Sequence, residues 1–297
     1  MNKNRLLSIA LIIIIYFISG GGSYVLFSEK PTSKIIKTSL STSETSEKLA
    51  FDEGLPKTEP CPMNGVLYSK QQREWWEKQR PVGIMIENHK EARPQSGLTS
   101  SDVVYEAVAE GGITRFLSIF YCNNAKVVGP IRSARTYFLD FVSEYGSSPL
   151  YVHVGGANQD GPADALSQIG DYGWIGLNDL NQFSIGFPTF WRDYDRLGHP
   201  AETEHTMYST TEKLLQFAAT SRKLKDVDEQ GVPWSKGFVP YSSKEDAPAG
   251  NRPATQTVHL EFWTMDPNYN VDWRYEPIAN LYKRNDGGVA LVDRNNN

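Results

Sequence analysis

In the middle of the chain, stretches whose apolar residues are spaced as in strands alternate with stretches whose apolar residues are spaced as in helices. This alternation constrains the fold most. The apolar run in PVGIMIEN (81–88) is short and continuous, as in a buried strand. Residues 132–145 place apolar side chains at helical spacing, which indicates a helix packed on a sheet. Residues 149–170 repeat the order of strand, glycine-rich loop and helix, with Asp160 and Pro162 marking the helix start. We therefore expect an α/β or α+β fold, a mixed sheet with flanking helices, over residues 61–225.

Two further regions predict antiparallel strands. Residues 103–121 hold two β-compatible runs around Gly111-Gly112, which indicates a hairpin, and NNAKVVGP (123–130) then predicts a turn and a third strand. After a Pro- and Gly-rich linker (226–252), alternating runs predict a smaller antiparallel β unit at 253–297. Because the last residues hold no obvious closing strand, we expect this β-rich domain to be incomplete.

The N-terminus predicts a membrane segment. Lys3 and Arg5 precede an apolar run (6–27) that is long enough to cross a bilayer as a helix, and the positive-inside rule keeps the N-terminus in the cytoplasm with the rest outside it. A signal peptide cut near the small residues 20–23 is the alternative. We expect a retained signal anchor, because the apolar run resumes at 24–27. Residues 28–60 are rich in Ser, Thr, Lys and Glu, which predicts a flexible, disordered tether.

Charge and cysteine content limit the partners. The net charge is −5 and the basic residues are scattered, so we expect no nucleic-acid partner. The two cysteines, Cys61 and Cys122, predict a single disulfide in an oxidising compartment, with two unpaired buried thiols as the alternative.

Arginines are the candidate site residues. Arg132 and Arg135 stand where the helix of residues 132–145 is expected to begin, and a cation there is disfavoured by about 0.3 to 1 kcal/mol. A compensating anion is therefore needed. It is either the phosphate or carboxylate of a ligand, or a carboxylate of the chain such as Glu106, Glu110 or Asp140 in a structural ion pair.

Other arginines could join the same site. Arg115 lies in a predicted strand, Asn88 ends the strand stretch at 81–88, and Arg93 follows it. Because strand ends and helix starts meet at one edge of such a sheet, we predict a ligand site formed by these three residues with Arg132 and Arg135.

The remaining motifs are weak. The loop GGANQDG (155–161) has neither the spacing of a dinucleotide fingerprint nor a P-loop lysine, and a tight turn is the alternative. GHPAETEHT holds His199 and His205, but it lacks the His-Glu-x-x-His pattern and contains a proline, so we expect no metal site and no cofactor. There is no Gly-x-Ser-x-Gly elbow and no marked acid/base pair, which leaves enzyme activity open.

Several strings resemble a known family. RPVGIMIENHKEARPQSGLTSSDVVYEAVAEGGITRFLSIFY, VGPIRSARTYF and YVHVGGAN are similar to the core of the YerB-like family of bacterial lipoproteins, a domain of unknown function, and the resemblance runs from about residue 61 to residue 209. The β-rich end is similar to the C-terminal domain of that family. The resemblance implies an extracytoplasmic, membrane-tethered protein and supplies no catalytic residues. The chain lacks a cysteine just after the apolar run, so we expect a helical anchor in place of acyl chains.

A weaker likeness is to the LytR-CpsA-Psr phosphotransferases, which hold a polyprenyl pyrophosphate with arginines beside a magnesium ion. The matching parts are GIMIEN, Arg93, TRFLSIF and PIRSART, with Ser133 where that family has an acid.

We therefore predict a membrane-anchored envelope protein with an arginine-lined site for an anionic ligand. One alternative is phosphotransfer on lipid-linked glycans. The other is a non-catalytic module that docks an envelope protein through its C-terminal β unit and its long irregular segment (171–207), whose aromatic residues otherwise pack in the core.

Overall fold

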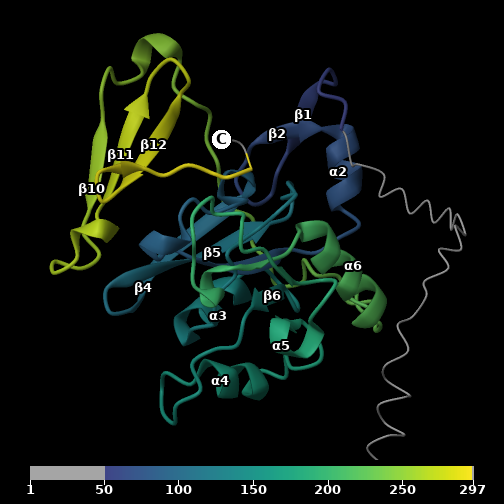
Figure 1. Ribbon diagram of the computed structural model, residues 1–297. Coiled ribbons are helices and arrows are strands. Elements are labelled where there is room, and N and C mark those ends of the chain that lie inside the picture. Colours follow the sequence, from purple (N-terminus) through teal and green to yellow (C-terminus); the bar gives the residue numbers. More distant parts are fainter. Residues whose placement is uncertain (1–50, 296–297) are drawn as a thin grey trace, which may run out of the picture. The chain divides into compact units, whose positions relative to one another are not determined.

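A five-stranded mixed sheet organises the computed structural model, which describes residues 51–295 (Figure 1). The strand order is β4-β5-β3-β6-β7. The strands are β3 (Val82–Glu87), β4 (Val103–Glu110), β5 (Ile113–Phe120), β6 (Leu150–His153) and β7 (Asp179–Asn181). β6 is parallel to β3 and β7, whereas β5 is antiparallel to β3 and β4. The predicted mixed sheet is confirmed.

Helices cover both faces of this sheet, as predicted. Met85 and Tyr151 face the core formed with α3 (Thr136–Ser143) and α4 (Ala165–Asp171). Ile84 faces the opposite core, where α6 (Thr211–Ser221) packs. The alternation follows from the two-residue period of a strand, and burial on both faces explains the continuous apolar run of β3.

One glycine sets the distance between helix and sheet. A Cβ at Gly83 would lie 2.7 Å from Cγ2 of Val142 in α3, closer than carbon atoms can approach. A larger residue there would push α3 away from β3.

Shorter elements complete the domain. They are β1 (Lys57–Pro60), β2 (Leu67–Ser69), α2 (Lys70–Trp76), α5 (Gln182–Ile185), β8 (Trp191–Arg192), β9 (Met207–Tyr208) and the 3-10 turns η1 (Lys90–Ala92), η2 (Leu98–Ser100) and η3 (Thr203–His205). A capping box of Ser69 and Gln72 starts α2. Cys61 and Cys122 form a disulfide in the buried core beside α2.

The C-terminal residues form a separate four-stranded antiparallel sheet, as predicted. Its strands are β10 (Thr257–Leu260), β11 (Val271–Glu276), β12 (Leu281–Asp286) and β13 (Val289–Ala290), with the turns η4 (Ala249–Asn251) and η5 (Pro267–Tyr269) before β10 and β11. The predicted linker at 226–252 is not wholly detached from the domain before it, because Trp234 is buried and its ring lies 4.7 Å from that of Tyr121.

The sequence prediction is wrong about the start of α3. The helix begins at Thr136 with Arg135 as its N-cap, so Arg132 lies before it. Residues 131–135 are extended instead, because their backbone pairs with other segments: Ile131 bridges Ile86, and Ala134 bridges Gly156. These long-range pairings replace the hydrogen bonds that a helix would have made.

Two other local predictions also need correction. Residues 123–130 form isolated bridges rather than a strand; Gly129 pairs with Ser96 and is followed by Pro130, which has no N–H to donate. α4 starts at Ala165, because the Asp164 carboxylate accepts the Ser167 N–H at 2.9 Å and caps the helix there.

The predicted membrane segment (1–27) and residues 28–50 of the predicted tether lie outside the described residues, whereas the end of that tether is ordered, because Lys57–Pro60 pair with β2 as strand β1. Within residues 51–295, no helix has the length and apolar character needed to span a bilayer.

Candidate functional site

The candidate site lies at the carboxyl ends of the parallel strands. β3 and β6 pair only over residues 82–84 of β3, and an extended segment then enters between them. Arg132 N–H donates to Met85 O at 2.9 Å, and Val154 N–H donates to Arg132 O at 3.0 Å. Arg132 is thus held by its backbone where neighbouring strands diverge, the usual place for a ligand in open α/β sheets.

A pocket of about 850 Å³ opens at this point. Its polar lining side chains are Arg132, Ser133, Asn158, Asn181, Arg192 and Thr203. Glu202 and Glu204 also line it, so its two arginines and two glutamates balance in formal charge. A volume of this size accommodates a small organic molecule.

Arg132 has one fixed and one exchangeable carboxylate partner. Its Nε lies 3.2 Å from Glu87 Oε1, and Glu87 is buried. Its Nη2 lies 3.3 Å from Glu204 Oε2, and the Glu204 side chain is 54% exposed. Glu204 can therefore rotate into solvent at little cost, whereas Glu87 stays beside the guanidinium.

A buried histidine holds the glycine loop that forms part of the pocket wall. His153 Nδ1 lies 2.6 Å from Gly155 O, and its Nε2 lies 2.6 Å from Asp179 Oδ1. Each ring nitrogen thus has one oxygen partner, and the ring is held between the glycine loop and β7. Asn181 Oδ1 accepts the Gly155 N–H at 3.1 Å from the other side.

Two predicted ligand residues, Arg115 and Arg135, form ion pairs with the same glutamate and do not line the pocket. Arg135 Nη2 lies 2.7 Å from Glu110 Oε2, and Arg115 Nη2 lies 2.9 Å from Glu110 Oε1. Burial lowers the pKa of Arg115, and the neighbouring charge of Arg135 lowers it further. Of the two predicted alternatives, a ligand anion or a carboxylate of the chain, the structure shows the second for these two arginines, and the carboxylate is that of Glu110.

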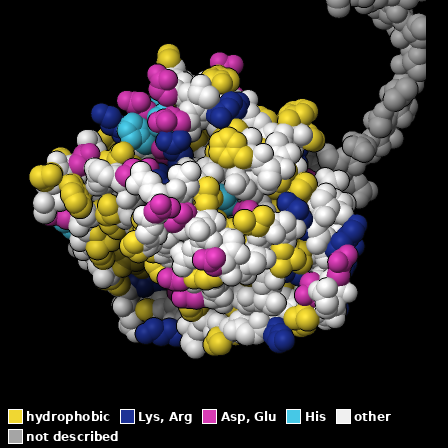
Figure 2. Space-filling model, turned by 90° about the horizontal axis from the view of Figure 1, so that it is seen from below, with side chains coloured by type: hydrophobic (Ala, Val, Ile, Leu, Met, Phe, Trp, Pro, Cys, Tyr) yellow, Lys and Arg dark blue, Asp and Glu magenta, His cyan; other side chains and the backbone are white. Residues whose placement is uncertain are grey.

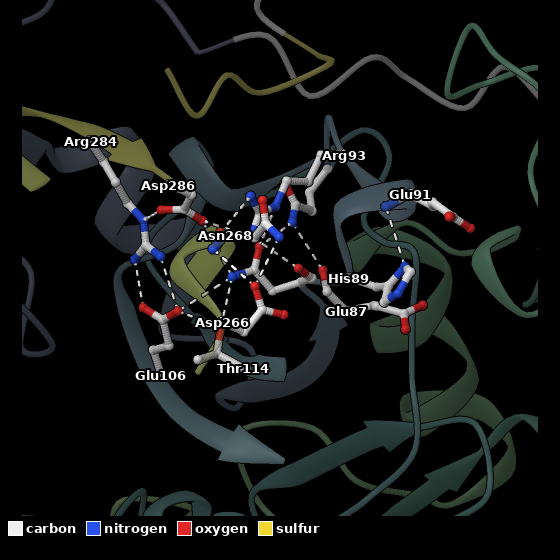
Figure 3. A network of polar contacts seen from close by, with 12 residues as sticks. Glu87, His89, Glu91, Arg93, Glu106, Thr114, Asp266, Asn268, Arg284 and Asp286 are labelled. Atoms are coloured by element: carbon white, nitrogen blue, oxygen red, sulfur yellow. Dashed lines mark hydrogen bonds and ion pairs between the residues drawn. The ribbon is translucent and has the colours of Figure 1, made fainter. Parts of the chain in front are cut away.

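Arg93 and Asn88 belong to a third group, at the C-terminal sheet (Figure 3). Arg93 Nη2 lies 3.4 Å from Asp286 Oδ2, and its Nε donates to Asn88 Oδ1 at 3.1 Å. Arg284 reaches the same aspartate at 2.6 Å and Glu106 at 2.7 Å. The five predicted ligand residues are thus not brought together, and of them only Arg132 lines the pocket.

The irregular segment supplies residues that the sequence prediction missed. Asn181, Arg192 and Glu204 all line the pocket and come from residues 171–207 or its borders. The length of that segment was the one available signal, and it identified no particular side chain.

The aromatic residues of this segment divide between core and surface. Phe190 is buried and Trp174 packs on the core, whereas Phe183 and Phe187 are 75% and 83% exposed. The core interpretation therefore holds for some of them only. Phe183 lines the pocket.

Charge on the surface is mixed. On the face in Figure 2, Lys and Arg side chains lie dispersed among acidic ones, without a basic stripe that could follow a phosphate backbone.

Comparisons with known proteins agree on one family. Residues 67–225, more than half of the chain, match the family described as "Protein of unknown function (DUF3048) N-terminal domain". The chain belongs to this family. Every residue that lines the pocket falls within the matched range, and the C-terminal sheet falls outside it.

The relatives confirm the predicted YerB-like resemblance. The chain is 30% identical over 238 residues to "Putative lipoprotein YerB" of Bacillus subtilis (strain 168), an alignment that covers 79% of this chain and 62% of that one. The chain therefore spans less than two thirds of the length of this relative. It is also similar to the crystal structure of the Bacillus subtilis YerB protein, with a TM-score of 0.61 and 27% identity over 80% of this chain and 70% of that one.

Proposed function

We propose that this protein binds a small anionic ligand, phosphorylated or carboxylated, in the pocket at the carboxyl ends of β3, β6 and β7. The observation that carries the proposal is the position of Arg132, which lines the pocket and has one of its two carboxylate partners, Glu204, exposed to solvent. A ligand anion takes the place of Glu204 at Nη2 and keeps the charge-assisted contact. Glu87 remains as a buried carboxylate 3.2 Å from Nε of the guanidinium.

The other lining side chains indicate the rest of the ligand. Asn158 and Asn181 supply amides, Arg192 supplies a second guanidinium, and the exposed ring of Phe183 offers an apolar surface. Such a set fits a polar ring such as a sugar that carries the anionic group. We therefore expect a phosphorylated or carboxylated saccharide to bind more tightly than inorganic phosphate.

Titration calorimetry on the full-length chain in detergent tests this proposal. The probes are pyrophosphate, N-acetylglucosamine 1-phosphate and glucuronate, with neutral N-acetylglucosamine as the charge control. Arg132→Gln should lower the affinity for the anionic probes at least tenfold, which corresponds to about 1.4 kcal/mol. Glu204→Gln should raise it, because the competing carboxylate is gone.

Arg135→Gln is the matched control. Arg135 has nearly the same side-chain exposure as Arg132, 19% against 21%, and also pairs with a glutamate. We expect it to change the affinity less than twofold. Equal losses in both arginine variants, or no binding of any anionic probe by the wild type, would remove the proposal.

We also propose that the protein acts outside the cytoplasm, held at the bacterial membrane by its N-terminal segment. Three observations support this location: the relative is described as a lipoprotein, an apolar run spans 6–27, and Cys61 and Cys122 form a disulfide. Protease treatment of intact protoplasts should digest a C-terminal tag, and the intact mass of the membrane-bound chain distinguishes a retained anchor from a cleaved signal peptide. A tag that stays protected until lysis contradicts the location.

We do not extend the proposal to phosphotransfer. The family that suggests this alternative has an acidic residue where this chain has Ser133. The contact that the structure gives Ser133 is through its backbone, whose carbonyl accepts a hydrogen bond from Arg115 at 3.0 Å. An envelope protein partner remains a prediction from sequence. The exposed ring of Phe187 lies in the segment that is predicted to dock such a partner.

A further inference from the structure

Two histidines from different segments meet beside the anion pocket. His89 follows β3 and caps η1, and His205 is the last residue of η3. Their rings are stacked, with centroids 5.0 Å apart and an angle of 6° between the planes. The sequence prediction of no metal site considered His199 and His205 within one segment, whereas the fold pairs His205 with His89.

A carboxylate completes a set of possible ligands. One donor atom each from His89, Glu91 and His205 lies within 4.8 Å of the other two. The second such group in residues 51–295 is Cys61, Asp102 and Cys122, whose sulfurs are already joined in the disulfide. Two imidazoles and one carboxylate are the ligands of many zinc sites that keep one position open for water or substrate.

The buried His205 is oriented as a metal ligand would be. Its Nδ1 lies 2.7 Å from Oε2 of Glu87, and both side chains are buried. When the ring is neutral, Nδ1–H donates to this carboxylate and the lone pair of Nε2 is left for an ion. A carboxylate that fixes the tautomer of a ligating histidine in this way recurs at zinc sites.

Local charge also favours a dication. Glu87, Glu91 and Glu204 surround the His205 ring, with contacts of 4.0 Å from Glu91 and 3.7 Å from Glu204 to Nε2. The guanidinium of Arg132 offsets one of these three negative charges. The remaining excess of two would be neutralised by one divalent ion.

We propose that His89, Glu91 and His205 bind a divalent first-row transition ion, with Zn²⁺ the probe that fits the ligand set best. Ligand atoms around tetrahedral zinc lie about 3.4 Å apart, so the donors must move closer together by rotation. The exposed Glu91 is able to do so, and the half-buried His89 does so by giving up the hydrogen bond that its Nδ1 accepts from the Glu91 N–H at 3.3 Å, while His205 stays fixed. This proposal does not depend on the anion site.

The test is metal binding by the full-length chain, stripped with chelator and held in detergent at pH 8. The hydrogen bond to Glu87 raises the pKa of His205, so a neutral to acidic buffer would let protons compete with the ion. We expect one Zn²⁺ per chain by competition with a chromophoric chelator, and visible absorption of bound Co²⁺ typical of a tetrahedral site.

Variants separate the site from adventitious binding. His89→Ala and Glu91→Gln change side chains that are not fully buried, so they should fold and lower the zinc affinity at least tenfold. Glu87→Gln, a positioning variant, should lower it by about 10- to 100-fold. His199→Ala is the matched control, since both ring nitrogens of His199 contact backbone carbonyls, and it should change the affinity less than twofold.

Two results would overturn the proposal. One is the absence of saturable binding of one ion per wild-type chain, and the other is a zinc affinity that is the same in His89→Ala and Glu91→Gln as in the wild type. Either result would leave His205 and Glu87 as a structural ion pair only.

Discussion

Asp102 offers a stability prediction whose sign follows from its surroundings. Its carboxylate is buried beside the disulfide, where Oδ2 accepts the N–H groups of Tyr121 at 2.6 Å and Cys122 at 2.8 Å. Burial disfavours the ionised form and raises the pKa of Asp102 to about 6, although these hydrogen bonds oppose the change. The unfolded carboxyl titrates near its ordinary pKa of about 3.9.

The folded state therefore binds this proton more tightly than the unfolded state. The contribution to the free energy of unfolding is fully present below the unfolded pKa and is lost as the pH rises through about 6. Linkage with these two pKa values predicts that this group stabilises the fold by about 1.3 kcal/mol more at pH 5 than at pH 7.

Urea denaturation of the wild type and of Asp102→Asn at both pH values isolates the effect. Asparagine has the same shape and no charge, so the other titrating groups cancel in the difference between the two proteins. We expect the stability of the wild type relative to the variant to increase by about 1.3 kcal/mol on going from pH 7 to pH 5. A difference that does not change with pH would mean that the N–H donors cancel the effect of burial on the pKa, and a change of opposite sign would mean that they outweigh it.

Substitutions at three other places in the fold, with one control, are tested by urea denaturation. The disulfide joins residues 61 positions apart, so Cys61→Ala/Cys122→Ala should cost about 4 kcal/mol; a cost below about 1 kcal/mol would contradict the loop-entropy argument. Arg284→Met leaves Glu106 without its cation, while Asp286 keeps Arg93 at 3.4 Å, and should cost about 3 kcal/mol, whereas the exposed Arg274→Met on β11 should cost less than about 0.5 kcal/mol; similar costs would refute the network. His153→Ala leaves Asp179 buried without its partner and should cost about 3 kcal/mol, an expectation that near-wild-type stability would exclude.

Sequence patterns predicted the elements that are determined by residues close together in the sequence. The hairpin of β4 and β5 turns at Gly111 and Gly112, which have φ of 60° and 83° and suit glycine. The extended segment at 131–135 could not be predicted in this way, because the Met85 carbonyl and the Val154 N–H that hold it are distant in sequence.

The site was predicted in part, and for an incorrect reason. The sequence selects Arg132 as a cation at a helix start, whereas the structure places it before the helix, between the diverging strands β3 and β6, where it lines a pocket. The helix-start pattern also selects Arg135, whereas Arg115 is predicted from its strand, and both arginines form ion pairs with Glu110 of the adjacent hairpin. Sequence gives no distances, so it could not separate these arginines or bring His89 to His205.

Glu204 links the two proposed sites. Its Oε2 lies 3.3 Å from Arg132 Nη2 and its Oε1 lies 3.7 Å from His205 Nε2, so one exposed carboxylate is shared between the anion-binding arginine and the proposed ion. A bound ion attracts Glu204 and frees the guanidinium, which predicts that Zn²⁺ raises the affinity for N-acetylglucosamine 1-phosphate. By linkage the phosphate must then raise the affinity for Zn²⁺ by the same factor. In Glu204→Gln both factors should fall toward one, and coupling that persists unchanged in this variant would show that the two sites communicate by another route.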